Sequence, residues 1–74
     1  MPDSEMEAAW RVIKRAEAHG CTFKIEAGRL AIEFPERIDQ ELWRSIQFDV
    51  LEHKLMIAGL VHARAELERE RRHG

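Results

Sequence analysis

The chain has 74 residues, and its 12 basic and 14 acidic residues give a formal net charge of -2. This balance offers no electrostatic basis for binding nucleic acid, and no apolar run is long enough to span a membrane. The N-terminal stretch MPDSEMEAAW also lacks the basic-then-apolar order of a signal peptide. We therefore expect a cytoplasmic protein that binds neither nucleic acid nor membrane and forms a single domain over residues 1–74.

The small size of the chain limits its stability, because a domain of this length buries only about 60% of its unfolded surface. The single cysteine, Cys21, excludes an intramolecular disulfide, and the histidines show no spacing typical of a metal site. With neither a disulfide nor a structural metal expected, oligomerisation is the remaining way to enlarge the core. We expect a homodimer.

The N-terminal part of the chain has the periodicity of an amphipathic helix. Apolar residues recur there at three- and four-residue steps, at Met6, Ala9, Trp10, Ile13 and Ala16. Asp3 or Ser4 is the expected N-cap, because a short polar side chain can accept a hydrogen bond from a free N–H group at a helix start. Gly20 is placed to end the helix in the left-handed conformation that favours glycine.

The segment Cys21–Pro35 alternates apolar and polar residues on both sides of Gly28, which predicts a β-hairpin. With Ala27 and Gly28 as the loop, the apolar face pairs Ile25 with Leu30, Phe23 with Ile32 and Cys21 with Phe34. The polar face then pairs Glu26 with Arg29, Thr22 with Glu33 and Lys24 with Ala31. Ala27 resists the positive φ that a two-residue loop demands, so a four-residue loop of the same parity is also open.

A second helix is expected from about Gln40, with Asp39 as its N-cap, and nothing forbids helix as far as His73. A single helix of that length would extend on the order of 50 Å, too far for so small a domain to bury. Either the helix breaks near residues 47–49, or it is apolar on two sides because a partner covers the second side. The surplus apolar residues predict a dimer interface at Leu51, Leu55, Met56 and Leu60.

Residues 62–74, HARAELERERRHG, carry acidic and basic side chains at helical spacing. They predict a charged helical tail, either solvated or acting as a partner-binding arm. The predicted fold class is α+β, a small αββα(α) domain with the hairpin packed against helices. Its predicted core is Trp10, Ile13, Phe23, Ile25, Leu30, Ile32, Phe34, Trp43, Ile46 and Val50.

Two sets of residues suggest chemistry or ligand stacking. Cys21 and His19 are close enough in sequence to act as a nucleophile and its base, but Cys21 lies on the apolar face of a predicted strand, where a thiol is usually buried and inert. Trp10 and Trp43 could stack on a base or a sugar, but both fall on apolar helical stripes and are assigned to the core. We predict no catalytic residues, no metal site and no cofactor, and therefore no enzyme.

Gly20 after the first helix, the stretch FKIEAGRLAIEFP and the later stretch HKLMIAGL together resemble the TubC-type N-terminal docking domains of hybrid nonribosomal-peptide and polyketide assembly lines. The resemblance covers about residues 12–61, and we expect a stand-alone, divergent member of that family. It implies an αββαα fold, a homodimer, and capture of a partner's C-terminal motif as a strand added beside the hairpin. By this resemblance, the receiving strand is lined by Lys24, Glu26, Arg29, Ala31 and Glu33.

These observations favour a non-catalytic docking or adaptor module that binds a segment of a protein partner at the hairpin, since an edge strand offers unpaired N–H and C=O groups. The charged residues there would select the partner, or would instead protect the bare edge from aggregation. The alternative is a small phage or mobile-element inhibitor, similar to anti-CRISPR proteins in size and style, that blocks a larger host complex by surface binding. A small enzyme using Cys21 ranks third.

Overall fold

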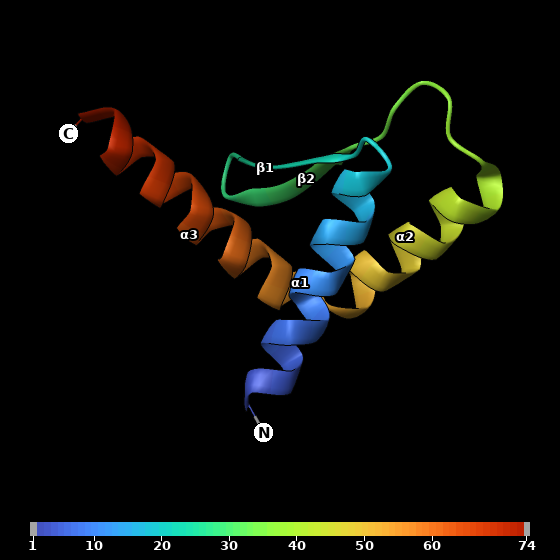
Figure 1. Cartoon of the computed structure of the whole chain (residues 1–74), viewed down its shortest axis with the longest axis horizontal. Coiled ribbons are helices and arrows are strands. Elements are labelled where there is room, and N and C mark those ends of the chain that lie inside the picture. The colour runs from blue at the N-terminus through green and yellow to red at the C-terminus, as the bar shows by residue number, and fades with distance from the viewer. Residues whose placement is uncertain (1, 74) are drawn as a thin grey trace.

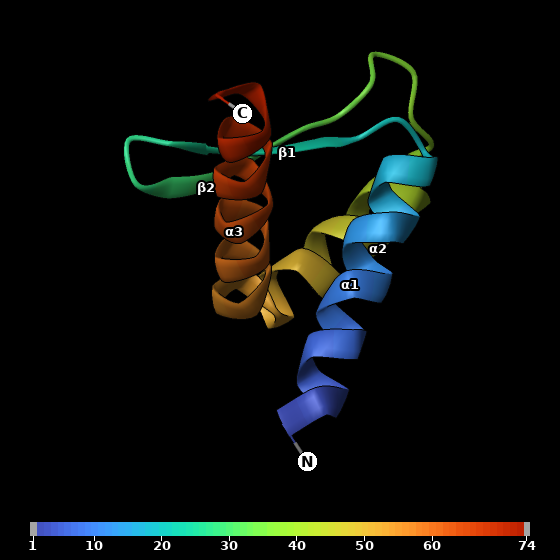
Figure 2. The same cartoon turned by 60° about the vertical axis from the view of Figure 1, so that its left-hand side comes forward.

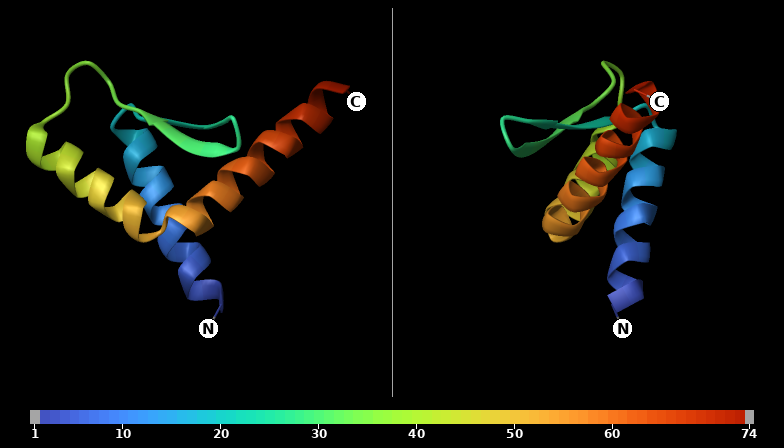
Figure 3. Two further views of the ribbon diagram at one scale, coloured as in Figure 1. Left: turned by 180° about the vertical axis from the view of Figure 1, so that it is seen from behind. Right: turned by 90° about the vertical axis from the view of Figure 1, so that its left-hand side faces the viewer.

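The computed structural model describes residues 2–73 as three helices and a two-stranded antiparallel sheet. The elements in chain order are α1 (Pro2–Ala18), β1 (Thr22–Glu26), β2 (Arg29–Glu33), α2 (Gln40–Glu52) and α3 (Lys54–His73). Figure 1 shows α2 and α3 as the two arms of a V, with the hairpin across its open side. α1 lies on one face of the V and packs against both arms (Figure 2 and Figure 3). The predicted α+β class is confirmed.

α1 begins earlier in the chain than the sequence predicted. The helix starts at Pro2 and so already includes Asp3 and Ser4. Proline suits the first turn of a helix, because the N–H group that it lacks would have no partner there and its fixed φ is already helical. The prediction that Asp3 or Ser4 precedes the helix as its N-cap is therefore wrong.

The C-terminal end of α1 is closed by Gly20, as predicted. Gly20 has a φ of 91°, and its N–H group donates to the Glu17 carbonyl at 3.0 Å. The N–H group of Cys21 donates to the Ala16 carbonyl, also at 3.0 Å. These two bonds form a Schellman motif, which satisfies carbonyls left free at the helix end. The motif turns the chain from α1 into β1 and leaves Cys21 buried in the core.

The hairpin has the predicted register. Its Cα partners are Thr22 with Glu33, Phe23 with Ile32, Lys24 with Ala31, Ile25 with Leu30, and Glu26 with Arg29. The loop has two residues rather than four, and both have positive φ, 51° at Ala27 and 77° at Gly28. Positive φ at both positions is the mark of a type I′ turn, whose twist matches that of the flanking strands. Ala27 is thus held in a conformation that alanine disfavours.

α2 begins where the sequence predicted, with Asp39 as its N-cap. The Leu42 N–H group donates to Asp39 Oδ2 at 3.2 Å. α2 ends at Glu52 and α3 begins at Lys54, so the break in the helical half lies at His53. The prediction of a break near residues 47–49 is therefore wrong.

The position of the break follows from packing. His53 has a φ of -114° and a ψ of 23°, yet its N–H group still donates to the Asp49 carbonyl at 3.2 Å. Its carbonyl accepts from the Ile57 N–H group at 2.9 Å. The chain changes direction without losing these bonds, and Ile57 returns to the core, where it is fully buried. A straight helix would carry Ile57 away from α1 and the hairpin.

The core lies between α1, the hairpin and the inner sides of the V. Its buried residues are Ala9, Ile13, Ala16, Cys21, Phe23, Ile46, Val50, Ile57 and Val61. Most other residues of the predicted core are partly buried against this cluster, but Trp43 is 36% exposed and lies at the surface. Its ring meets Phe34 edge-on, with the ring centroids 5.9 Å apart. The predicted core also lacked Ile57 and Val61, which α3 contributes.

Candidate functional site

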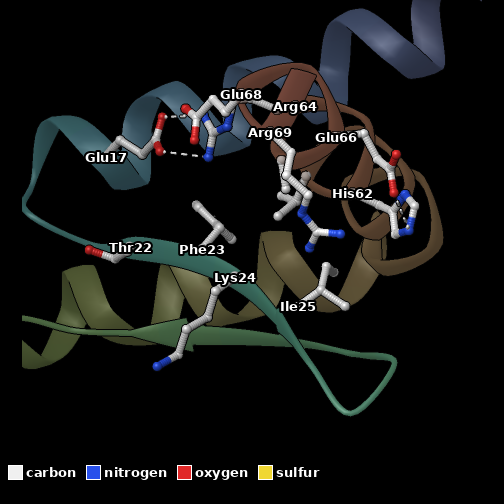
Figure 4. A pocket seen from close by; sticks show the side chains of 12 residues that line it. Glu17, Thr22, Phe23, Lys24, Ile25, His62, Arg64, Glu66, Glu68 and Arg69 are labelled. Atoms are coloured by element: carbon white, nitrogen blue, oxygen red, sulfur yellow. Dashed lines mark hydrogen bonds and ion pairs between the residues drawn. The ribbon is translucent and has the colours of Figure 1, made fainter. Parts of the chain in front are cut away.

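A groove of about 620 Å³ runs along β1 on the side of α3 (Figure 4). One wall is formed by residues 22–25 of β1, and the other by residues of α3 between positions 61 and 69. Glu17, near the end of α1, closes one end. Three elements that are far apart in the sequence therefore meet at this groove.

The edge of β1 that faces outward has unpaired backbone groups. Glu26 and Arg29 flank the two-residue loop and so form a hydrogen-bonded pair, and bonded and non-bonded pairs alternate from there. The N–H and C=O groups of Phe23 and Ile25 therefore point away from β2. Among residues 2–73, no hydrogen bond joins the backbone of β1 to a group outside the hairpin. The edge can accept another extended strand.

The base of the groove is apolar. Phe23 and Val61 line it and are 5% and 3% exposed, because both belong to the core. Ile25 and Ala65 extend this apolar surface towards the solvent, with Ile25 half-buried and Ala65 exposed. A peptide strand beside β1 would place every second side chain over this surface, because side chains alternate along a strand.

An ion pair joins α3 to α1 at one end of the groove. The Arg64 guanidinium of α3 contacts the Glu17 carboxylate of α1 through both terminal nitrogens, with Nη2–Oε2 at 3.0 Å and Nη1–Oε1 at 3.2 Å. Both side chains are about one-third exposed. This two-point contact resists rotation of α3 about its axis, because a guanidinium and a carboxylate meet in one plane.

The five predicted partner-binding residues lie on the polar face of the hairpin, with Lys24 at the centre. The Lys24 ammonium contacts Glu26 at 2.8 Å and also contacts Glu33 on the other strand. Hydrogen bonds to Glu26 and Glu33 raise the pKa of Lys24 above its ordinary value of 10.5. The register places Arg29 and Ala31 on this face as well, and no ion pair within residues 2–73 involves Arg29. The ammonium of Lys24 points away from α3 and from the groove (Figure 4).

The predicted dimer interface separates into an exposed pair and a half-buried pair. Leu51 is 63% exposed and Leu55 is 90% exposed, at the corner where α2 meets α3. Met56 and Leu60 are half-buried and pack against the buried residues of the core. Phe48, also 63% exposed, lies on α2 nearby in sequence. Phe48, Leu51 and Leu55 are therefore the exposed large apolar residues of this part of the chain.

The residues that suggested chemistry are not assembled into a reactive site. Cys21 is 4% exposed, and burial raises the pKa of its thiol above the ordinary value of 9.0. His19 is exposed, and no hydrogen bond between described residues joins it to Cys21. Within residues 2–73 no group of three or more His, Cys, Asp or Glu side chains could hold a metal ion. The helices of this part of the chain are also too short or too polar to cross a membrane.

The α3 wall of the groove is the part of the site that sequence reasoning missed. Residues 62–74 were predicted as a charged tail, and the described part of that segment does continue α3 as a helix to His73. Its first two turns, however, border β1 instead of standing free in solvent. The available signal was Arg64, placed one turn after buried Val61, but a charged helix beside solvent has the same sequence pattern.

The fold and the groove define a small α+β domain with an open-edged hairpin. Comparison with models of known protein families, with curated proteins and with solved structures finds no match. The resemblance to TubC-type docking domains stays a prediction.

Proposed function

We propose that the chain is a non-catalytic docking or adaptor module that binds an extended segment of a partner protein as an additional strand on β1. The observation that supports this proposal best is the unpaired outer edge of β1 beside an apolar groove. Strand addition needs both features, because backbone hydrogen bonds provide affinity and pockets for alternate side chains provide specificity.

The bound segment would lie between β1 and α3. Its backbone would bond the outward N–H and C=O groups of Phe23 and Ile25. Side chains on its inner face would cover Val61 and Ala65, and those on its outer face would lie beside Lys24. The polar face of the hairpin would therefore take part in partner selection. The bound segment would contact β1 directly, and β2 would lie one strand further away.

The proposal is tested by selecting binders from a library of random peptides on the immobilised chain. Each selected peptide is then resynthesised with one backbone nitrogen methylated at a time, which removes a single N–H donor. Strand addition requires binding to be lost at every second position, since alternate N–H groups of a strand point towards its neighbour. Loss of binding without this alternation would contradict strand addition, and so would failure of every peptide to bind.

The polar face is tested by charge reversal. In a variant with Lys24→Glu and Arg29→Glu, we expect the selected peptides to lose binding, because both changes place a carboxylate where a cation stood. The matched control reverses Arg37 and Arg44, which are exposed and do not line the groove. Circular dichroism establishes that each variant is folded. Undiminished affinity in the first variant would assign the polar face a purely structural role.

We also propose that the module is a homodimer, assembled through the exposed corner formed by Leu51 and Leu55. Met56 and Leu60 would support these residues from beneath, and a two-fold axis would bring each patch against its copy. Sedimentation velocity should give a dimer for the unmodified chain and a monomer for the variant with Leu51→Glu and Leu55→Glu. Leu67→Glu, at another exposed apolar position of α3, is the control and should remain a dimer. A monomer at concentrations well above micromolar for the unmodified chain would overturn this proposal.

A further inference from the structure

We infer that the groove selects peptide segments that carry an acidic side chain, and that Arg69 of α3 recognises it. This inference rests on the proposed strand addition. Arg69 lines the groove, and Figure 4 shows its side chain extending from α3 towards β1, beside Ile25. Its guanidinium stands over the position that an inserted strand would occupy.

Arg69 differs from the other cations of the groove in having no carboxylate partner among the described residues. Arg64 is bound to Glu17, and Lys24 is bound to two carboxylates of the hairpin and points away. The His62 ring lies 3.9 Å from the Glu66 carboxylate. A guanidinium with free donors in a fork geometry matches a carboxylate with two hydrogen bonds.

Two of the acidic residues that line the groove, Glu17 and Glu68, lie at one end of it, and Glu66 lies beside His62. Figure 4 places Glu68 at the Glu17 end of the groove, next to the Arg64 guanidinium, and Arg69 towards the Ile25 end. A peptide carboxylate near Glu68 would meet like charge, whereas one beside Ile25 would meet Arg69. The acidic side chain therefore belongs at the peptide residue that lies alongside Ile25, on the groove side.

The apolar base of the groove and the Arg69 guanidinium together define the chemistry of the bound peptide segment. An extended segment with apolar side chains at alternate positions covers Phe23 and Val61, and one of its groove-side positions is Asp or Glu. A partner of the opposite character, with Lys or Arg at that position, would bring like charge against Arg69.

The test compares peptides selected from the same random library on the unmodified chain, on Arg69→Glu and on Arg71→Glu. Arg71 is exposed on α3 and does not line the groove, so it controls for the change in net charge. We expect Asp or Glu at one fixed position on the unmodified chain and on Arg71→Glu, and Lys or Arg at that position on Arg69→Glu. Replacing the selected acid by its amide in the synthetic peptide should weaken binding to the unmodified chain roughly tenfold.

A second variant, Arg69→Gln, removes the charge while keeping a polar side chain of similar helix propensity, and should lose the acidic preference without inverting it. If selected peptides show alternating sensitivity to backbone methylation but no fixed acidic position, the Arg69 inference fails and strand addition stands. The inference also fails if Arg71→Glu alters the preference as much as Arg69→Glu does. If no selected peptide shows the alternation, both the inference and strand addition fail.

Discussion

Arg64 of α3 and Glu17 of α1 are joined at two points, at 3.0 and 3.2 Å, although 47 positions separate them in the chain. Val61, one turn earlier in α3, is the last buried residue of the core. The ion pair therefore lies just beyond the core and joins α3 to α1. Both of its residues line the groove, at the end that Glu17 closes.

Breaking this pair should loosen the second half of α3 and leave the core intact. For Glu17→Gln or Arg64→Gln, we expect a loss in free energy of unfolding of only about 0–1 kcal/mol, because the pair is one-third exposed. Hydrogen exchange should nevertheless accelerate at the amides of residues 64–73. A double-mutant cycle with both changes isolates the pairwise energy. Unchanged exchange in that segment would mean that other contacts hold α3 in place.

Ile57 should be among the most sensitive positions of the chain. It is fully buried, and Ile57→Ala removes methyl and methylene groups and leaves a cavity, at a cost of about 2–5 kcal/mol. Leu67→Ala, on the same helix but at a side chain that is 61% exposed, should change stability by less than about 0.5 kcal/mol. Urea denaturation followed by circular dichroism measures both. Equal effects would contradict the assigned position of the helix break, which brings Ile57 into the core.

Two glycines should respond to alanine with opposite signs. Gly20 has a φ of 91°, where an added side chain costs about 1–2 kcal/mol, and its new Cβ would lie at an ordinary contact distance of 3.5 Å from Pro35. Gly59 is inside α3, with open space around the added Cβ, so alanine should stabilise by about 0.5–1 kcal/mol. Thermal unfolding of Gly20→Ala and Gly59→Ala tests the pair. Destabilisation by Gly59→Ala would instead reveal a close contact there, as at a dimer interface.

Lys24 should make stability depend on pH in the alkaline range. Its hydrogen bonds to Glu26 and Glu33 raise the pKa in the folded chain above the ordinary 10.5. A raised pKa means that the stabilising contribution is fully present below pH 10.5 and is lost as the pH rises through the folded value. The difference in melting temperature between the unmodified chain and Lys24→Gln should therefore be constant from neutral pH to about pH 10 and shrink above pH 10.5. A difference that stays constant at higher pH would contradict the contribution of the ammonium.

The hairpin could be predicted in detail because its information is local. Alternation and parity around Gly28 predicted one register, and the observed register places Phe23 and Leu30 on the inner face as expected. Only the loop length was open, because Ala27 disfavours positive φ. The strand pairing outweighs this preference at a single residue, and the turn closes with two residues.

The helix break and the groove could not be predicted, because both depend on contacts distant in sequence. Neither glycine nor proline marks His53, and the chain turns there because Val50 and Ile57 pack into one core from two helices. The same turn brings the charged segment of α3 beside β1. Trp43 was assigned to the core from its place on an apolar stripe, yet it is 36% exposed, because that place does not show how far neighbouring elements cover the side chain.

The helix that begins at Lys54 serves two purposes along its length. Up to Val61 it is part of the folding unit, and substitutions there are constrained by the core. From residue 62 to residue 72 no side chain is buried, so side chains there can be exchanged with little cost in stability. In the proposed binding mode, partner preference and fold stability are carried by different turns of one helix, and related sequences would be free to diverge in what they bind while keeping the same domain.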